Sequence, residues 1–312
     1  MDKETRPYPS QAYSWYVVCV LLAAYILAFV DREIIALLVP GIKASLHISD
    51  TQMSLLLGAA FAIFYTFFGV LIASFADRGN RRNLLFAGIV FWSLMTMMCG
   101  VAMTFPLLFI ARVGVGAGEA TLNPCALSML KDYFPPDRIG RAIGLYTAGV
   151  SSGSGIAFII GGTFYPAIQA AGPAHWPILG VVEPWQQMFI YVGAPGLLIA
   201  LLLLTVREPP RGWSDPPGLA KTARSGIGFT LRLLRDKPSF WYMTVAASLV
   251  AMVGYGYAAF QAPMMQRLHG MPPGEFALRF GVPLSAAGAI GTIAAGYLTA
   301  VLIRRSIRWV AL

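Results

Sequence analysis

The sequence alternates between long apolar stretches and short polar segments. Eight of the stretches are long enough to cross a bilayer, since a spanning helix needs about 20 apolar residues. They lie near residues 15–39, 52–76, 84–104, 106–130, 140–167, 187–206, 239–261 and 281–303. The pattern therefore predicts an all-α, polytopic membrane protein with the lipid bilayer as its surroundings.

Composition narrows the functional classes. Hydrophobic residues make up 57% of the 312 residues and charged residues only 12%, whereas about a quarter of the residues in a soluble domain are charged. A membrane enzyme would need acids or histidines near a membrane face and a sizeable domain outside the bilayer, and the sequence offers neither. His47, His175 and His269 all fall in predicted outer loops. We therefore expect a protein that is not an enzyme.

The cysteines give no sign of a metal site. Cys19, Cys99 and Cys125 fall within apolar spans, without CxxC spacing and without nearby histidines. This placement favours small buried packing residues over a disulfide framework or a metal centre. We expect neither a metal nor another cofactor.

The distribution of basic residues predicts the orientation. The formal net charge is +9, which by itself would be compatible with a nucleic-acid partner. Most of the Lys and Arg residues, however, fall in segments on the same side of the membrane as the N-terminus. The positive-inside rule then places the N-terminus in the cytoplasm of a bacterial inner-membrane protein. The basic charge therefore reflects topology, and we expect no nucleic-acid partner.

The spans fall into two groups. We predict a cytoplasmic N-terminus at 1–14, a six-helix bundle at 15–206, a cytoplasmic linker at 207–238 and a partial second bundle at 239–312. The linker is rich in Pro, Gly and Arg, which no membrane span would accommodate. Within it, residues 226–236 have the spacing of a short helix on the membrane surface, although a flexible basic loop explains them equally well.

Residues 69–82, GVLIASFADRGNRR, form a charged turn between the second and third spans. A helix is expected to end near Ala76, and the turn then carries one acid and three arginines. The segment resembles the signature loop between helices 2 and 3 of the major facilitator superfamily of secondary transporters. This resemblance implies a gating loop made of Gly69, Asp77, Arg78, Arg81 and Arg82. It also implies two six-helix halves, so we expect this chain to be truncated after helix 8.

Charged residues inside the spans are the strongest candidates for the mechanism, because each costs about 2.5–3.5 kcal/mol to insert. Asp31, Arg32 and Glu33 interrupt the first span. Arg112 and Glu119 lie seven residues apart in the fourth span, within about 20° on one helical face. Asn123 extends that face. We predict that Asp31 pairs with Arg112 and Arg32 with Glu119. Such pairs could form a proton switch or could be static pairs that fix helix register.

Four motifs together indicate a narrower group. FVDRE, ADRGNRR, ARVGVGAGEA and KDYFPPDRIGRAIGLYTAG occur in this order between about residues 25 and 212. They resemble the spinster-like group of the superfamily, which implies a proton-linked carrier. On this resemblance Asp31, Arg32, Arg112 and Glu119 match coupling and substrate-contact positions. Asp77 and Arg81 match residues that latch the two bundles.

The same resemblance suggests the cargo. Eukaryotic spinster-like proteins are associated with the export of lysolipids, which implies an amphiphilic substrate moved by alternating access. Candidates to line its cavity are Tyr25, Tyr65, Tyr146, Tyr255 and Gln261, although any single aromatic residue in a span can equally be a packing residue. The alternatives are a proton symporter for small organic anions of the sugar-acid type and a truncated membrane protein that transports nothing. We expect the full-length protein to be a monomer whose partners are its substrate and protons.

Overall fold

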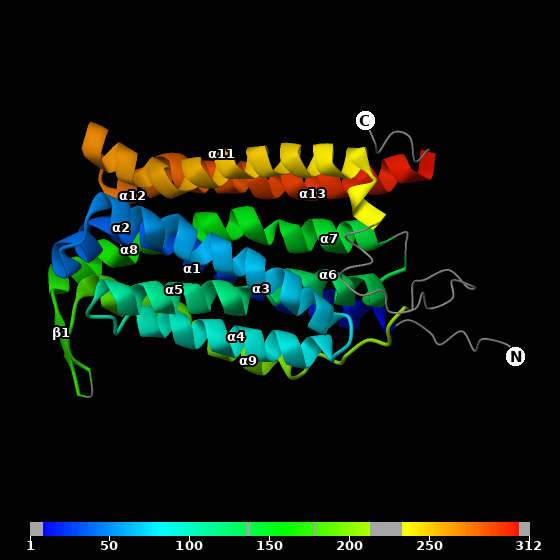
Figure 1. Cartoon of the computed structure of the whole chain (residues 1–312), viewed down its shortest axis with the longest axis horizontal. Helices are drawn as coiled ribbons and strands as arrows, with labels where there is room; N and C mark the ends of the chain where they lie inside the picture. Colours follow the sequence, from blue (N-terminus) through cyan, green and yellow to red (C-terminus); the bar gives the residue numbers. More distant parts are fainter. Residues whose placement is uncertain (1–8, 136–137, 178, 213–232, 306–312) are drawn as a thin grey trace, which may run out of the picture.

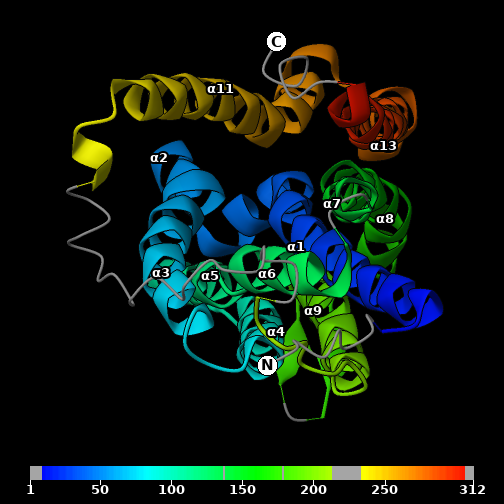
Figure 2. The ribbon, with the colours of Figure 1, turned by 90° about the vertical axis from the view of Figure 1, so that its right-hand side faces the viewer.

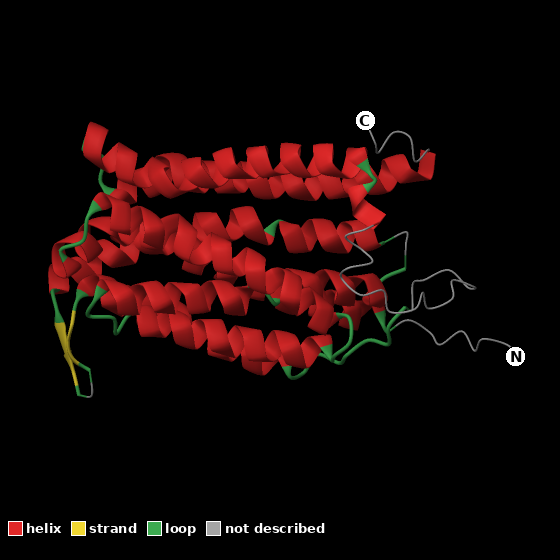
Figure 3. Ribbon diagram, in the orientation of Figure 1, coloured by secondary structure: helices red, strands yellow, loops and turns green. Residues whose placement is uncertain are grey.

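The computed structural model describes residues 9–135, 138–177, 179–212 and 233–305. Almost all of this chain is helical (Figure 3). The elements are α1 Gln11–Leu46, α2 Asp50–Ser54, the π-helical η1 Leu55–Ala59, α3 Ala60–Ala76, α4 Arg81–Cys99, α5 Phe105–Glu119, α6 Leu122–Tyr133, α7 Ile139–Thr147, α8 Gly149–Ala171, β1 Ala174–Trp176, β2 Gly180–Val182, α9 Pro184–Leu203, α11 Pro238–His269, α12 Pro273–Phe276, the π-helical η2 Ala277–Gly281 and α13 Val282–Arg305.

The eight predicted spans are confirmed. Eight helical segments of the described chain are long and apolar enough to cross a membrane. Several are built from consecutive elements, such as α5 with α6 and α7 with α8, which together form the spans Phe105–Tyr133 and Ile139–Ala171. Most spans are longer than predicted because polar turns continue the helices beyond their apolar stretches. For example, α1 begins after the N-cap Ser10, whose side chain accepts a hydrogen bond from the backbone N–H of Tyr13, and such a cap satisfies an otherwise free donor.

The helices run roughly parallel to one long axis (Figure 1). A short antiparallel hairpin, β1 with β2, projects at one end of the bundle, which we call the hairpin end. The turn between α3 and α4 lies at the opposite end, which we call the basic end. Because successive spans connect alternately at the two ends, the arrangement is that of a chain passing repeatedly through a membrane.

Seen along the helices, α11 and α13 lie along one side of the other helices (Figure 2). These other helices, α1 to α9, are called the larger group below. In the larger group, α4 packs against α5 and α9, and α1 packs against α8. On the other side, α13 packs against α7 and α8, and α11 contacts α1. The predicted division at residues 207–238 stays a prediction, and most of its predicted surface helix lies outside the described residues.

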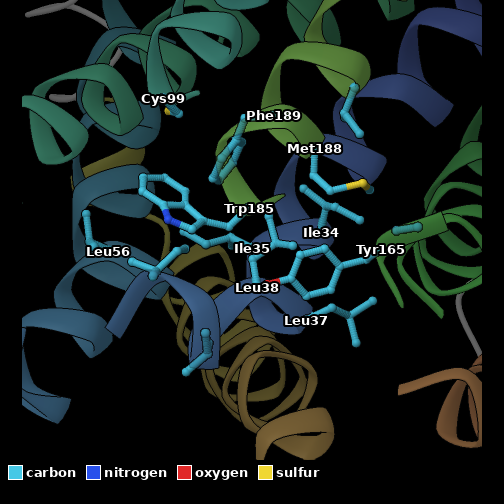
Figure 4. Close-up of a cluster of buried hydrophobic side chains, with 14 of the residues drawn as sticks. Ile34, Ile35, Leu37, Leu38, Leu56, Cys99, Tyr165, Trp185, Met188 and Phe189 are labelled. Atoms are coloured by element: carbon cyan, nitrogen blue, oxygen red, sulfur yellow. The ribbon is translucent and has the colours of Figure 1, made fainter. Parts of the chain in front are cut away.

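A dense apolar core fills the hairpin half of the larger group (Figure 4). In it, Trp185 and Phe189 of α9 contact a cluster from α1 and α8 that includes Ile34, Leu38 and Tyr165. Large side chains on the opposite faces of the helices point outward, as Ile63 of α3 does with 62% exposure. Since lipid is as apolar as these side chains, close packing rather than hydrophobicity holds the helices together.

The prediction that all three cysteines are buried needs one correction. Cys99 and Cys125 are buried as predicted, but Cys19 is exposed. Cys19 lies in an apolar span, yet its neighbours Val18 and Val20 occupy the buried face of α1, so Cys19 is left on the outward face. Apolar surroundings in the sequence do not distinguish packing against protein from contact with lipid.

Candidate functional site

The charged residues of the first and fourth spans meet inside the bundle. Arg32 of α1 donates from Nε to Oε2 of Glu119 on α5 at 2.6 Å, and the Glu119 side chain is fully buried. This confirms the predicted Arg32–Glu119 pair. A charge-assisted bond of this length is strong, because the carboxylate that accepts it is shielded from water.

The second predicted pair, Asp31 with Arg112, is wrong, because the two side chains bind other groups. Nη1 of Arg112 donates to the backbone carbonyl of Asp31 at 3.2 Å, while Oδ2 of Asp31 accepts from the Thr96 hydroxyl at 3.1 Å. The Asp31 carboxylate therefore faces α4, and Arg112 reaches only the main chain of α1. Sequence reasoning missed Thr96, although an isolated hydroxyl within an apolar span is a usable signal for a buried polar partner.

These buried groups keep unused hydrogen-bonding capacity. Within the described chain, Oδ1 of Asp31, Nε of Arg112 and Oε1 of Glu119 have no hydrogen-bond partner. A buried polar atom without a partner costs free energy, and native proteins leave few of them. Three such atoms in one cluster make it a candidate site for a ligand or a proton.

Aromatic rings surround the Arg32 guanidinium. Its central carbon lies 4.7, 4.5 and 4.8 Å from the ring centres of Phe29, Phe61 and Tyr65. Rings at these distances attract a cation through their π faces, and more strongly where water is excluded. Arg32 is therefore held by three rings in addition to Glu119.

Asn123 connects three of the predicted tyrosines. Its Nδ2 donates to the hydroxyls of Tyr65 at 3.2 Å and Tyr25 at 3.4 Å, and its Oδ1 accepts from the Tyr146 hydroxyl at 2.9 Å. The rings of Tyr25 and Tyr146 are stacked with their centres 4.5 Å apart. Asn123 thus fixes tyrosines from α1, α3 and α7 beside the charged cluster.

A cavity of about 490 Å³ opens on this cluster, between the larger group and α11. Arg32, Arg112 and Tyr65 form part of its wall on one side, and Tyr255 closes it from α11. The lining residues are Arg32, Glu33, Ala36, Ser54, Leu57, Gly58, Phe61, Ala62, Tyr65, Thr66, Arg112, Tyr255, Gly256 and Phe260.

The other three residues that were predicted to line a substrate cavity do not line this one. Tyr25, Tyr146 and Gln261 are buried, and none of them lines the cavity. Tyr25 and Tyr146 are linked to it through Asn123 and Tyr65. The cavity thus presents two guanidinium groups and one carboxyl group among aromatic and apolar side chains, which suits an anionic group carried on an apolar body.

In the charged turn at the basic end, one arginine side chain is buried and paired, and two charged side chains are exposed. Arg81 is buried and pairs with Asp132 and Glu208, each at 2.6 Å. Asp77 and Arg78 are exposed. A Cβ added at Gly69 would meet nothing within 4 Å. The turn is thus fixed at Arg81, while its first two charged side chains project from the surface.

Further contacts hold the turn to the segment after α9. The backbone N–H of Arg82 donates to Oε2 of Glu208 at 2.9 Å, and Arg211 donates to the carbonyl of Asp77 at 2.8 Å and also to those of Ala76 and Gly79. Sequence reasoning missed Asp132, Glu208 and Arg211. The only signal was their position just beyond or near the ends of apolar spans, which does not reveal a partner.

Comparisons with known proteins agree with this arrangement. The family model "Major Facilitator Superfamily" matches residues 21–312. An "MFS-type efflux pump" of Mycolicibacterium smegmatis (strain ATCC 700084 / mc(2)155) is 28% identical over 308 residues, which are 99% of this chain and 67% of the relative. "Protein spinster homolog 1" of Homo sapiens is 32% identical over 265 residues, 81% of this chain and 46% of the relative.

A solved structure is also similar. A crystal structure of a bacterial homologue of the human lysosomal transporter spinster, in an inward-facing and unoccupied conformation, superposes with a TM-score of 0.77 at 40% identity. The match covers 95% of this chain and 64% of that one, so the chain spans about half to two thirds of these relatives. The relatives are transporters, which confirms the expectation that the protein is not an enzyme. The chain belongs to the major facilitator superfamily and is a spinster-like member of it.

Proposed function

We propose that the protein is a proton-coupled secondary carrier that moves an amphiphilic or organic-anion substrate by alternating access. The observation that carries the proposal is the cavity lined by Arg32 and Arg112 between the larger group and α11. Its volume of about 490 Å³ lies within the range of about 300–1,000 Å³ that small-molecule sites occupy. It lies between two groups of helices, where carriers of this superfamily place their substrate.

The two arginines have different roles in the proposal. In the part of the chain that the structure describes, Arg112 donates a hydrogen bond to the backbone carbonyl of Asp31, and its Nε has no hydrogen-bond partner. A planar guanidinium with free donors can bind a carboxylate or phosphate through two parallel hydrogen bonds. Arg32 is held by Glu119 and becomes available when that carboxylate is neutralised. The substrate anion first meets Arg112 and then recruits Arg32.

Proton coupling follows from this competition. Burial favours the neutral form of an acid, and a nearby arginine favours its ionised form. A proton on Glu119 would loosen its pair with Arg32, and a proton on Asp31 would remove the negative charge beside Arg112; either change would permit the two groups of helices to rock. The driving reaction is the transfer of a proton from water on one side of the membrane to water on the other.

The charged turn is proposed as the gating loop. Because Arg81 is anchored by Asp132 and Glu208, the exposed Asp77 and Arg78 are presented at the surface in a fixed place. There their charges can contact another helix of the carrier. We propose a monomeric bacterial inner-membrane protein whose basic end and N-terminus face the cytoplasm, in agreement with the positive-inside rule.

Uptake into proteoliposomes under an imposed pH gradient tests the proposal. We expect Glu119→Gln to abolish pH-driven movement of a labelled lysolipid or organic anion while the protein stays folded, because an amide can still accept a bond from Arg32 but cannot titrate. Glu275→Gln is the matched control, since Glu275 pairs with Arg279 at an exposed site. Unchanged proton-coupled uptake by Glu119→Gln would contradict the proposal.

A second candidate substrate class is favoured by the pair of arginines in one cavity wall. Two guanidinium groups would suit a compact sugar acid as well as the head of an amphiphile. Competition of uptake by sugar acids, without competition by lysolipids, would identify a small organic-anion symporter.

A further inference from the structure

Glu33 is a cavity-facing carboxyl group that takes no part in the pairing described above. It follows Arg32 on α1, is partly buried and lines the 490 Å³ cavity. Within the described residues it makes no hydrogen bond and no ion pair. Asp31 and Glu119, in contrast, are fully buried and do not line the cavity. Of the three acids in the cluster, Glu33 is the one in contact with the cavity.

The charges of the cluster do not balance. Three carboxyl groups, those of Asp31, Glu33 and Glu119, are accompanied by two guanidinium groups, those of Arg32 and Arg112. An excess charge among membrane-spanning helices is costly. A proton on one of the acids removes the excess.

The contacts indicate which acid takes that proton. Glu119 receives a charge-assisted bond from Arg32, and Asp31 receives the Thr96 hydroxyl as a donor. Hydrogen bonds donated to a carboxylate favour its ionised form. Glu33 has no such donor and can be reached by water from the cavity.

We propose that Glu33 is the carboxyl group that exchanges protons with water in the cavity. The inference rests on the proposed proton-coupled carrier and deepens it. A proton moves from cavity water to a carboxylate oxygen of Glu33, and it returns to water when the cavity opens on the other side. Neutral Glu33 no longer attracts the adjacent Arg32, and the proton that Glu33 takes from cavity water is then available to the Arg32–Glu119 pair.

The groups around Glu33 come from every helix that lines the cavity. Those that are charged or can titrate are Arg32 of α1, Tyr65 of α3, Arg112 of α5 and Tyr255 of α11. From α2 and η1 the lining residues are Ser54, Leu57 and Gly58, none of which titrates. Asp50 and Arg267 line a smaller hollow nearer the hairpin end. Both guanidinium groups keep their charge at all accessible pH values, so a change near neutral or acidic pH reports an acid.

Labelling with a hydrophobic carbodiimide tests the proposal without a substrate. The reagent reacts with protonated carboxyl groups, and peptide mass spectrometry locates the adduct in the full chain in liposomes. We expect the adduct on Glu33, with little on Asp31 or Glu119. Above the titration midpoint its rate of formation should fall about tenfold per pH unit, as for a single titrating group.

Three variants test whether the adduct requires a carboxyl group at position 33. Glu33→Asp should keep the pH-dependent adduct, and Glu33→Gln should remove it. Glu275→Gln, at the exposed ion pair on α12, should leave it unchanged. An adduct that forms on Glu119 or Asp31 instead, one at Glu33 that does not vary with pH, or none at Glu33 would overturn the proposal. Because labelling requires no transport, a wild-type protein that is labelled as expected but shows no pH-driven uptake would refute the carrier mechanism alone.

Discussion

The helices α11 and α13 meet the rest of the molecule along two seams of different construction. Along the α13 seam, with α7 and α8, the backbones approach closely: a Cβ added at Gly144 would lie 3.2 Å from Cα of Gly296, and one at Gly155 would lie 2.5 Å from Cβ of Ser285. Small residues permit this approach in membrane proteins. The seam is therefore closely packed at these positions.

The α11 seam, with α1 to α3, is open and contains charged groups among apolar side chains. Here the cavity separates the helices, and most of α11 is exposed apart from a few residues such as Gln261 and Ala262. At the hairpin end, Asp50 of α2 binds Lys43 of α1 at 2.6 Å and Arg267 of α11 at 2.9 Å. The contrast teaches that the α13 seam is suited to act as a pivot and the α11 seam to change width.

The largest expected effect concerns the cavity wall of the α11 seam. Glu119→Ala breaks a buried ion pair and leaves Nε of Arg32 without its carboxylate partner, which should cost about 3–5 kcal/mol of unfolding free energy. Thermal or denaturant unfolding in detergent measures it. Glu275→Ala, at an exposed pair, should change stability by no more than about 0.5 kcal/mol. Equal effects of the two variants would show that the wall does not depend on this pair.

A smaller effect is expected in the α13 seam. A Cβ added at Gly288 would lie 2.4 Å from Oγ of Ser151, whereas one at Gly291 on the same helix would meet nothing within 4 Å. Gly288→Val should therefore cost about 1–3 kcal/mol through overpacking. Gly291→Val is its matched control, because both substitutions introduce the same side chain three residues apart. If both variants unfold alike, the seam is not closely packed.

The smallest stability effect is expected at the hairpin end of the α11 seam. Asp50 and Arg267 are 67% and 58% exposed, and ion pairs between exposed side chains contribute little to stability. Asp50→Asn should thus barely lower the unfolding midpoint, yet it removes the ion pair between α2 and α11 as well as the one between α2 and α1. The difference from the wild type should vanish in about 1 M salt, where exposed charges are screened.

The same variant should widen the seam. In a background with exposed Cys19 replaced by Ser, a Ser54→Cys probe reports the access of water-soluble maleimide, because Ser54 lines both the cavity and the hollow beside Asp50. Asp50→Asn should raise its alkylation rate. An unchanged rate would mean that these ion pairs do not close the seam.

The spans and one buried pair could be predicted from the sequence. Long apolar stretches specify membrane helices without knowledge of their neighbours. The Arg32–Glu119 pair was predictable because Arg112 and Glu119 share one face of a helix and a second helix carries complementary charges. The contacts of Asp31 were not, because they involve a hydroxyl and a backbone carbonyl, groups that occur along the whole chain.

The contacts that hold the helices together along the two seams could not be predicted from the sequence. Asp50 and Arg267 are 217 positions apart, and neither lies in a recognisable motif. Arg81 belongs to the signature turn, yet its partners Asp132 and Glu208 lie near the ends of other spans, where charged residues are common. Which helices are neighbours is decided by packing, and hydropathy alone contains no information on it.

Distances across both seams test the central claim, that the α13 seam is a pivot and the α11 seam a gate. Spin labels at exposed positions avoid disturbing the packing: Val70 with Tyr242 across the α11 seam, and Ile159 with Leu284 across the α13 seam. Double electron–electron resonance in liposomes would measure the distance distribution of both spin-label pairs before and after acidification. The account predicts that the Val70–Tyr242 distance distribution shifts while the Ile159–Leu284 distribution stays narrow and unchanged. Equal shifts in both pairs, or a shift confined to the α13 seam, would contradict it.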